Sequence, residues 1–364
     1  MTIAAHIIGS PSVLWESLNR LAITQPQNHF IFFIDTAGRQ PADIPGNCTP
    51  VLISPKIKNS LLLHYWYNYK LPHQLKRYNA DVFISENAVL SLNINTAQIM
   101  LVKNITGEKK TIPGQDKHAR YLQKFFPAFL KKAMTILTTE KYLAEIIAEK
   151  YPFATGKIFP VYHGLNKNYQ PLGWQQKEEI KTIHADEKDY FLFTVSANTK
   201  NNIIAVLKAF SHFKKWQKSN MQLLLLAQNK DAVAIKDFHL YKYRKEVKII
   251  TGSDNKEAAE IMAAAYALIY LPVKQSADQP CLEAMQCGIP VITADNILNK
   301  SMYDDAVIYT GTEEKIIAEK MMLLYKDENL RSNYIKKGLM QTAKYNWDNT
   351  AQLFWQAIIK MGEQ

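Results

Sequence analysis

Short apolar runs rich in Ile, Val, Phe and Leu alternate with helical segments along the whole sequence. This pattern is typical of parallel sheets covered by helices, because each strand is then buried on both faces and each crossover needs a helix. It predicts strands at residues 3–8, 30–34, 81–84, 99–102, 134–138 and 158–161, and further strands at 190–195, 221–227, 247–251, 267–273 and 291–294. It predicts helices at residues 12–22, 121–132, 142–150, 203–213, 258–264 and 280–287.

The chain divides in two near its middle. Residues 166–188 are polar and charged and contain Pro171 and Gly173, after which a new strand begins at Tyr190. We therefore expect an α/β fold with two doubly wound, Rossmann-like domains, at residues 1–172 and 173–344. Residues 345–364 contain a closing helix, expected at 347–360, that returns to the first domain. Doubly wound sheets bind ligands at the carboxyl ends of their strands, so we expect the two sheets to face a cleft where the chemistry takes place.

The composition is that of a globular protein. The 364 residues, 47% of them hydrophobic, are enough for two buried cores. The longest apolar run, residues 263–273, is about half as long as a segment that crosses a bilayer. The first residues lack the basic opening of a signal peptide, and Cys48, Cys281 and Cys287 have no metal-ligand spacing. We expect a cytoplasmic protein without disulfides, metal or cofactor.

The net charge of +11 indicates that the protein attracts anions. Nucleic acid, acidic lipid headgroups and phosphorylated small molecules all carry the required charge. The 44 Lys and Arg residues are spread along the chain, without an arginine-rich arm, a zinc-finger pattern or an aromatic RNA-binding motif. We therefore expect no nucleic-acid partner.

The segment from Leu271 to Thr293 carries the strongest functional signal. Pro280 is tolerated in the first turn of a helix, and Gly288 followed by Pro290 ends that helix before the next strand. The free backbone amides of a helix start, together with the helix dipole, make a site for an anion such as a diphosphate. The candidate residues for this contact are Gln279, Pro280, Cys281 and Leu282.

Glu283 is the acidic residue of this segment, and we expect it in the first turn of the helix. A carboxylate there can accept hydrogen bonds from both hydroxyls of a ribose, as acidic residues do in other nucleotide-binding folds. The alternative is that Glu283 only complements the helix dipole, a contribution under about 1 kcal/mol. Taken alone, the residue favours that simpler role.

The whole segment resembles the signature of glycosyltransferase family 4, in which a glutamate, seven residues and a second glutamate precede Ala-Met, followed by Cys-Gly-x-Pro-Val-Ile. The matching residues are Pro280, Leu282-Glu283-Ala284-Met285, Cys287-Gly288 and Pro290-Val291-Ile292. Weaker similarity covers most of the chain, including residues 190–193, 202–203, 207–210, 81–83, Lys157-Ile158-Phe159-Pro160 with Gly164, and Tyr345-Asn346-Trp347.

This resemblance implies the GT-B fold and a retaining transfer from a nucleotide-diphosphate sugar, without an obligatory metal ion. It implies that Glu283, at the position of the second glutamate, binds the ribose. The first glutamate of the family lies beside the transferred sugar, and Gln275 stands at its position. Gln275 is therefore the residue expected to bond the donor sugar, without a negative charge.

The chain departs from the family where positive charge normally neutralises the donor diphosphate. Ser196 and Asn201 stand at the positions of the family's arginine and lysine. Lys200, one residue displaced, is the candidate replacement, and a solvated lysine is the equal alternative. Lys274 is a weaker candidate, and Asn202 is the remaining residue expected on the donor side.

The acceptor side departs as well. The family's His-Asp pair is replaced by Lys103-Asn104, so an acceptor-side histidine is missing. Gly9-Ser10 follow the first strand, where the family approaches donor or acceptor with its backbone, although a simple tight turn explains the pair equally. We expect structural rather than catalytic roles for His6 and His163.

These departures leave three functions open. The first is a transferase that moves a sugar to a glycan or lipid-linked acceptor; retaining transfer in this fold depends on positioning and on stabilising the leaving diphosphate. The second is a catalytically inert GT-B scaffold that binds a glycan or a partner transferase. The third is other nucleotide-sugar chemistry.

Two segments mix aromatic and basic side chains, residues 64–77 and 118–132. Such a surface can rest on an anionic membrane leaflet, which would place the protein at the inner face of the membrane. An aromatic core beside a solvated basic face explains either segment at least as well.

Overall fold

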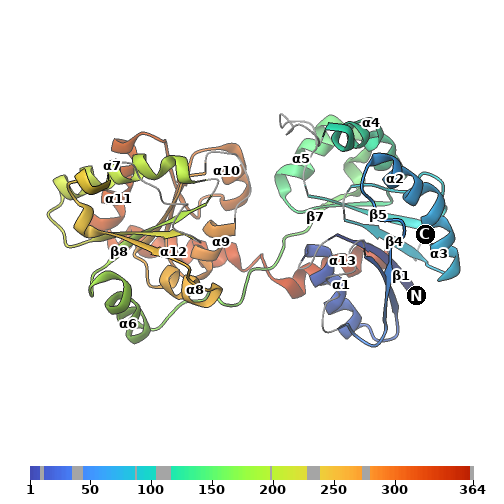
Figure 1. The fold of residues 1–364 in the computed structure, drawn as a ribbon, viewed down its shortest axis with the longest axis horizontal. Coiled ribbons are helices and arrows are strands. Elements are labelled where there is room, and N and C mark those ends of the chain that lie inside the picture. Colours follow the sequence, from blue (N-terminus) through green and yellow to red (C-terminus); the bar gives the residue numbers. More distant parts are fainter. Residues whose placement is uncertain are drawn as a thin grey trace. The chain divides into compact units, whose positions relative to one another are not determined.

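The computed structural model describes residues 1–8, 12–34, 44–86, 88–103, 116–196, 199–227, 238–272 and 279–360. The chain forms two compact units. The first comprises Met1–Gly164 and Tyr345–Gln364, and the second Leu165–Lys344 (Figure 1).

The first unit contains a parallel seven-stranded sheet in the order β3-β2-β1-β4-β5-β6-β7. Its strands are β1 (Thr2–Ile7), β2 (His29–Ile34), β3 (Cys48–Leu52), β4 (Val82–Ser85), β5 (Ala97–Val102), β6 (Thr135–Thr138) and β7 (Ile158–Pro160). Its helices are α1 (Val13–Thr24), α2 (Ser60–Tyr65), α3 (Leu71–Arg77), α4 (Asp116–Lys132), α5 (Lys141–Lys150) and α13 (Trp347–Ile359). A π-helical segment, Trp66–Lys70, joins α2 to α3.

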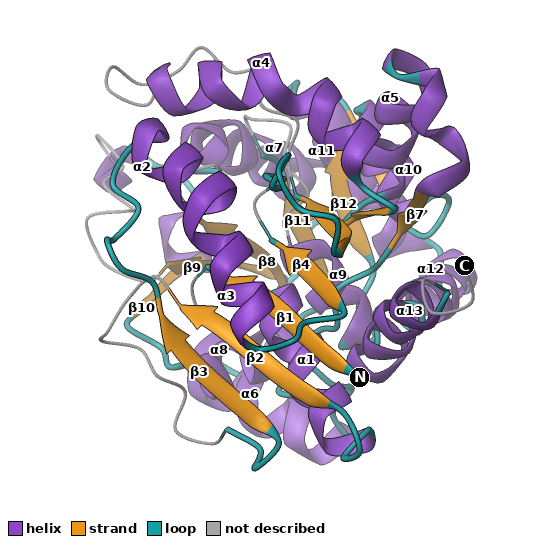
Figure 2. Ribbon diagram, turned by 90° about the vertical axis from the view of Figure 1, so that its right-hand side faces the viewer, coloured by secondary structure: helices purple, strands orange, loops and turns teal. Residues whose placement is uncertain are grey.

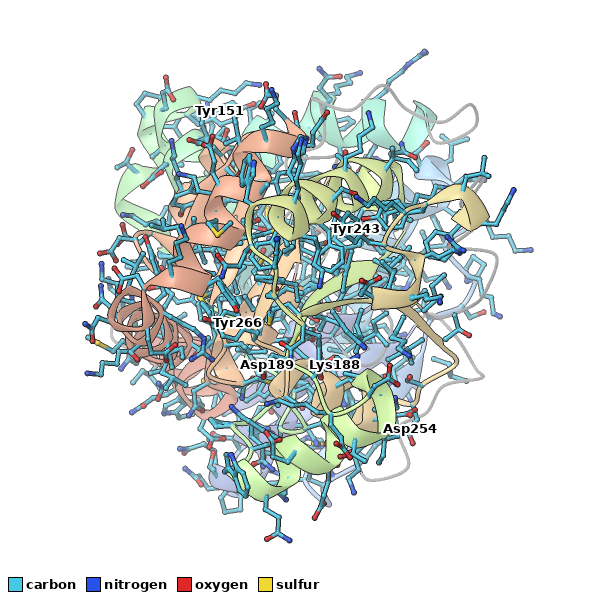
Figure 3. All side chains as sticks on the ribbon, turned by 90° about the vertical axis from the view of Figure 1, so that its left-hand side faces the viewer. Tyr151, Lys188, Asp189, Tyr243, Asp254 and Tyr266 are labelled. Carbon is cyan, nitrogen blue, oxygen red and sulfur yellow. The ribbon has the colours of Figure 1, made fainter. Side chains whose placement is uncertain are left out.

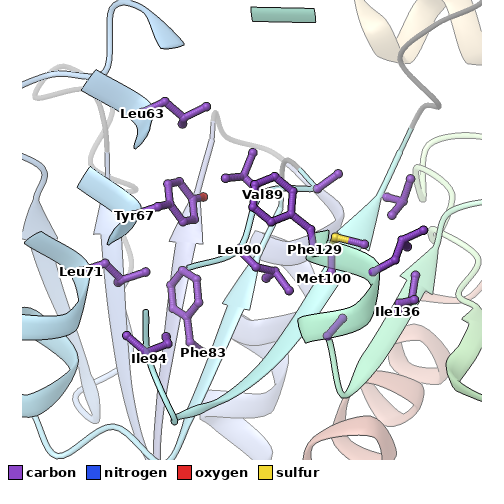
Figure 4. Packing of buried hydrophobic residues seen from close by; sticks show 14 of the residues in the cluster. Leu63, Tyr67, Leu71, Phe83, Val89, Leu90, Ile94, Met100, Phe129 and Ile136 are labelled. Carbon is purple, nitrogen blue, oxygen red and sulfur yellow. The ribbon is translucent and has the colours of Figure 1, made fainter. Parts of the chain in front are cut away.

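Both faces of this sheet are buried, as the apolar runs predict. Alternate residues of each strand enter opposite cores: Ala4 lies in one cluster, while Ile3 and Ala5 lie in the other. The first cluster lies under α2, α3 and α4 (Figure 4), and the second under α1 and α13. Figure 2 shows β3, β2, β1 and β4 side by side.

The aromatic segment at residues 64–77 is divided between the core and the surface. Trp66 and Tyr67 are buried in the first cluster, and Tyr67 points into it beside Phe83 (Figure 4). Tyr65 and Tyr69 are exposed, with stacked rings 5.8 Å apart. The core interpretation therefore holds for half of these aromatic residues.

The C-terminal helix packs on the first unit through two segments that the sequence analysis singled out separately. Gly164 lies against the ring of Trp347, so closely that a Cβ at Gly164 would be 2.2 Å from Trp347 Cγ. The ring of Tyr345 contacts Tyr162 and His163, at centroid distances of 5.2 and 5.8 Å. Only glycine fits at position 164, because any side chain would displace the first residue of α13.

The second unit contains a parallel six-stranded sheet in the order β10-β9-β8-β11-β12-β13. Its strands are β8 (Tyr190–Val195), β9 (Gln222–Ala227), β10 (Val247–Thr251), β11 (Ala267–Tyr270), β12 (Val291–Ala294) and β13 (Ile308–Thr310). Its helices are α6 (Trp174–Ala185), α7 (Ile203–Trp216), α8 (Asn255–Ala263), α9 (Gln279–Gln286), α10 (Ile297–Tyr303), α11 (Glu314–Lys326) and α12 (Glu328–Thr342). Figure 3 shows its side chains, with Lys188, Asp189 and Tyr266 near one another at the amino ends of the strands.

The division between the units falls after Gly164, earlier than the one expected after residue 172. The reason is packing: residues 169–171 lie against α9 of the second unit, where Pro171 approaches Gly288. Composition marks this segment as polar, but it does not say which core the segment joins.

The predicted strands are confirmed, with ends that differ by a few residues; β11 ends at Tyr270, and residue 273 lies outside the described part of the chain. Two edge strands were not predicted. β3 contains Pro50, which an edge strand tolerates because one side of it has no partner, and β13 is only three residues long. Helix α6 was not predicted either, because it buries only Ala185 and therefore shows no apolar stripe.

Candidate functional site

The order in which successive strands are added to the second sheet reverses between β8 and β11. β9 and β10 lie on one side of β8, whereas β11, β12 and β13 lie on the other. In doubly wound sheets the loops that leave the carboxyl ends of two such strands diverge and leave room for a ligand. Here Lys200 and Asn202 follow β8, and Leu271 follows β11, at these carboxyl ends.

Asn202 joins these two loops. Its Nδ2 donates a hydrogen bond of 2.7 Å to the carbonyl oxygen of Leu271. The turn before it is fixed by the buried Thr199, whose Oγ1 accepts from the backbone N–H of Ser196 at 2.8 Å and donates to the carbonyl oxygen of Thr194 at 2.7 Å. Lys200 lies between them with an exposed side chain, at the same end of β8.

The start of α9 is held against β11 and β12 by a small polar network. Thr293 Oγ1 donates to the carbonyl oxygen of Tyr270 at 2.9 Å and accepts from Asn299 Nδ2 at 3.2 Å. The buried thiol of Cys281 lies 3.8 Å from the same Thr293 Oγ1. This network anchors the helix start, where Leu282 is buried, Pro280 is half-buried and Gln279 is exposed.

Helix α9 ends at a glycine, as the sequence predicts. Gly288 has a φ of +72°, and the N–H of Ile289 donates to the carbonyl oxygen of Ala284 at 3.1 Å. This left-handed closure needs glycine because a Cβ would be strained there.

Glu283 lies in the second turn of α9 and not in the first, because the helix begins at Gln279. Its carboxyl group is largely buried and lies near the hydroxyl of Tyr169. Burial raises the pKa of Glu283 to about 7, and the nearby hydroxyl of Tyr169 opposes that rise. A glutamate that only complemented a helix dipole would lie in the first turn and in solvent, so this geometry argues against the simpler role.

The first sheet has the same kind of switch, between β1 and β4. There the buried carboxylate of Glu86 accepts from the backbone N–H of Ile8 at 2.9 Å and forms an ion pair with Lys103. One side chain thus connects the carboxyl ends of three neighbouring strands, β1, β4 and β5. Glu86 was not predicted as a site residue, although an acidic residue directly after the apolar strand 82–85 is a detectable signal.

The two histidines lie in buried surroundings. His6 Nδ1 is 2.7 Å from the hydroxyl of Tyr67, which is 3.0 Å from Ser85 Oγ. Complete burial lowers the pKa of His6 to about 3, and burial also lowers the pKa of His163. Both imidazoles are therefore neutral near pH 7, in line with the structural roles proposed for them.

Several candidates lie outside the described residues. These are Gly9, Ser10, Asn104, Lys274 and Gln275. Among the described residues, no three His, Cys, Asp or Glu side chains gather in a way that could hold a metal ion. None of the helices in the described ranges is long and apolar enough to cross a membrane.

Comparison with known proteins agrees with this arrangement. Residues 175–340 match the family "Glycosyl transferases group 1". The O-antigen chain mannosyltransferase RfbU of Salmonella typhimurium is 21% identical over 239 residues, which are 64% of this chain and 63% of the relative. The chain thus spans less than two thirds of the length of this relative.

Solved structures match over the whole chain. Sucrose-phosphate synthase from Thermosynechococcus elongatus has a TM-score of 0.71 at 14% identity, covering 100% of this chain and 99% of its own. Anabaena HepE, solved with UDP and glucose, has a TM-score of 0.67 at 13% identity, covering 98% of each chain. Residues 175–340 therefore form a domain of the glycosyl transferases group 1 family within a GT-B fold, and the resemblance to glycosyltransferase family 4 is confirmed at that level.

Proposed function

We propose that this chain is a retaining glycosyltransferase that moves a sugar from a nucleotide-diphosphate sugar to a hydroxyl of a glycan or lipid-linked acceptor. The observation that carries the proposal is the junction of β8 and β11. Asn202 joins the two loops there, and the polar network under α9 anchors the helix that presents Glu283. This is the position at which a doubly wound sheet binds a nucleotide.

The proposed roles on the donor side follow from charge and geometry. Glu283 binds the two ribose hydroxyls, which a carboxylate can accept together. The backbone at 279–282 and the ammonium of Lys200 or Lys274 face the diphosphate, whose charge grows as the sugar leaves. Gln275 bonds the donor sugar through its amide.

On the acceptor side, Lys103 provides a positive charge near the point between β1 and β4 where the strand order of the first sheet reverses. The ion pair with Glu86 holds its ammonium there. Its ammonium can donate further hydrogen bonds to an acceptor oxygen. Gly9, Ser10 and Asn104 are the neighbouring candidates in sequence. The O-antigen mannosyltransferase similarity supports an acceptor from cell-envelope polysaccharide synthesis, and the HepE structure with UDP and glucose supports a nucleotide sugar as the donor.

We further propose that the first unit rests on an anionic membrane surface. Helix α2 packs against α4, and residues 44–80 and 117–139, which include most of both helices, contain no Asp or Glu. Leu61, Tyr69 and Lys70 are exposed on the segment from α2 to α3, and Lys124 is exposed on α4. A surface with apolar and basic side chains and no acidic ones matches an anionic leaflet.

Sedimentation with liposomes tests the membrane proposal. Binding is expected with anionic vesicles at low salt, and it should weaken at high salt and in a Lys70→Gln/Lys124→Gln variant. A Lys245→Gln/Lys336→Gln variant, changed on the second unit, serves as the control. A protein that fails to sediment at low salt does not use this surface.

The rival proposal is an inert scaffold, which the departures at Ser196 and Asn201 favour because they remove positive charge from the diphosphate site. Calorimetric titration with uridine, guanosine, adenosine, cytidine and thymidine diphosphates separates the two functions. Saturable binding of one nucleotide, weakened at least about tenfold in Glu283→Ala, supports the donor site. Folded protein that binds none of the five supports the scaffold.

A further inference from the structure

Helix α11 has an apolar outer face in addition to the face that it buries. Ile317, Met321 and Leu324 are fully buried in the core of the second unit, as the inner face of an amphipathic helix requires. On the outer face Leu323 is 42% exposed, and Trp216, the last residue of α7, is 45% exposed. Large apolar side chains that gather on one face mark an interaction surface, whereas single ones need no explanation.

These exposed side chains line an open groove of about 370 Å³ where the end of α7 meets α11. The two helices lie side by side (Figure 1). The apolar lining of the groove is Trp216, half-buried Met322 and Leu323, and its charged lining includes Glu319 and Lys326. Along α11 the apolar pair therefore lies between a negative and a positive side chain.

The two charged residues lie on one face of α11. Glu319 and Lys326 are seven residues apart, which is two helical turns and about 10 Å along the axis. Both side chains are exposed, and within the described part of the chain neither has an ion-pair partner. The neighbouring carboxylate of Asp327 has a different role, because it caps α12 by accepting from the backbone N–H of Leu330 at 2.9 Å.

We propose that this face of α11 binds a second copy of the same chain. The two α11 helices run antiparallel, and a two-fold axis passes between Met322 and Leu323. A two-fold contact is reciprocal: if one residue meets another, the second also meets the first. With the axis at this point, Met322 lies opposite Leu323 of the partner subunit, and Glu319 lies opposite Lys326 of the partner subunit. Each of these contacts occurs twice, so both charges on each copy gain a partner of opposite sign.

The apolar centre and the charges have different tasks in this dimer. The centre supplies most of the affinity, with Trp216 as its largest anchor, because exposed ion pairs contribute little. The charges fix the register and exclude wrong partners. A contact made by one face of two helices is smaller than a standard interface, so we expect dissociation constants on the order of 10–100 μM. The contact involves no residue of the proposed donor site and does not rest on the proposed function.

A similar groove on α6 lacks this self-complementary order. It also measures about 370 Å³, and Glu178 and Glu179 lie between Trp174 and Ile183 along the helix. The same two-fold arrangement would place Glu178 opposite Glu179 of the partner subunit. Like charges would then meet at the centre and oppose association. The order of charges thus favours a second copy at α11 and not at α6.

Sedimentation equilibrium of the full chain tests the proposal, at protein concentrations from about 1 to 200 μM. The wild type should approach twice the mass of one chain at the upper end. Glu319→Lys places lysines opposite lysines, and Lys326→Glu places glutamates opposite glutamates, so each should weaken the dimer about tenfold. Glu319→Lys/Lys326→Glu restores opposite charges and should bring the dissociation constant back to within about threefold of the wild-type value.

An equimolar mixture of the two single variants gives the sharpest result. In a dimer with one copy of each, every charged contact again joins opposite signs. The mixed dimer should therefore form more tightly than either variant does alone, although both copies carry the same local changes to α11. Trp216→Ala should weaken the dimer about tenfold or more through the apolar centre. Glu179→Lys, a charge reversal on α6, is the control and should leave the dimer unchanged.

Three results would overturn the proposal. They are a wild type that stays monomeric at the highest concentration, a dimer that none of the α11 charge reversals weakens, and a mixture that associates no better than its components. Thermal unfolding of each variant at low concentration verifies that the fold is kept, which we expect because both changed side chains are exposed. If one single variant unfolds, the double variant and Trp216→Ala still decide the outcome.

Discussion

Asn202 donates from its Nδ2 to the carbonyl oxygen of Leu271 over 2.7 Å, and this bond joins the carboxyl ends of β8 and β11. The two residues are 69 positions apart in the chain. Their contact closes the switch point of the second sheet, next to exposed Lys200 and ahead of the loop that leads to α9.

Replacing Asn202 by Ala should destabilise the second unit and weaken nucleotide binding. The change leaves the Leu271 carbonyl without this donor, which costs about 1–2 kcal/mol. Urea unfolding measures the stability, and calorimetry measures the affinity. Asn201→Ala, at the exposed neighbouring position, is the control and should change stability by less than about 0.5 kcal/mol. Equal effects of the two substitutions would contradict the bridging role.

The pair of Glu86 and Lys103 should behave as one energetic unit. Lys103→Met leaves a buried carboxylate unpaired, and Glu86→Leu removes both the ion pair and the acceptor for the Ile8 N–H. We expect each single change to cost about 2 kcal/mol, below the usual range for a buried pair because Lys103 is partly exposed. The double variant should lose less than the sum of the two single losses.

A double-mutant cycle by urea unfolding provides the measurement for this pair. Additive losses would show that the ion pair contributes nothing. Nucleotide affinity should stay at the wild-type value in all three variants, because both residues belong to the first unit.

His6 should make the first unit sensitive to acid. Its pKa is lowered from 6.5 to about 3 by burial, so between these values the unfolded chain binds a proton that the folded chain does not. Stability therefore rises with pH across this window, and the contribution of His6 falls by about 2 kcal/mol between pH 6.5 and 5. His6→Asn keeps a polar atom near Tyr67 but cannot titrate.

Urea unfolding at pH 7.5 and pH 5 should give a smaller acid loss for His6→Asn than for the wild type. The charged groups of the exposed surface contribute equally to both proteins and cancel in the difference. If the two proteins lose the same stability, the imidazole does not remain neutral in the folded state.

Gly164→Ala should loosen the C-terminal helix. The new methyl group would lie 2.2 Å from the near end of the Trp347 ring, so the ring and the start of α13 must move. We expect a loss of about 2 kcal/mol or more and faster amide hydrogen exchange in α13. Gly156→Ala is the control because nothing lies within 4 Å of its added carbon. Unchanged exchange in α13 would contradict this contact.

The sequence by itself determined the fold class and the position of the α9 segment. Local periodicity marks the buried strands and helices. The backbone conformations of Pro280 and Gly288 depend on these residues themselves and not on tertiary contacts. For the same reason the sequence could single out Glu283 and Asn202 as candidates, because both lie in segments whose pattern and family resemblance are local.

Only the tertiary structure decided which residues from distant parts of the chain contact the candidate site residues. The Glu86 carboxylate meets a backbone amide 78 positions away, and Tyr169 lies near Glu283 although the strands β8 to β11 come between them in the chain. Such contacts depend on how the helices pack on each sheet, and a single sequence carries no periodic signal for them. The tertiary structure likewise assigned residues 165–172 to the second unit, since burial against α9 and not polarity determines which core a linking segment joins.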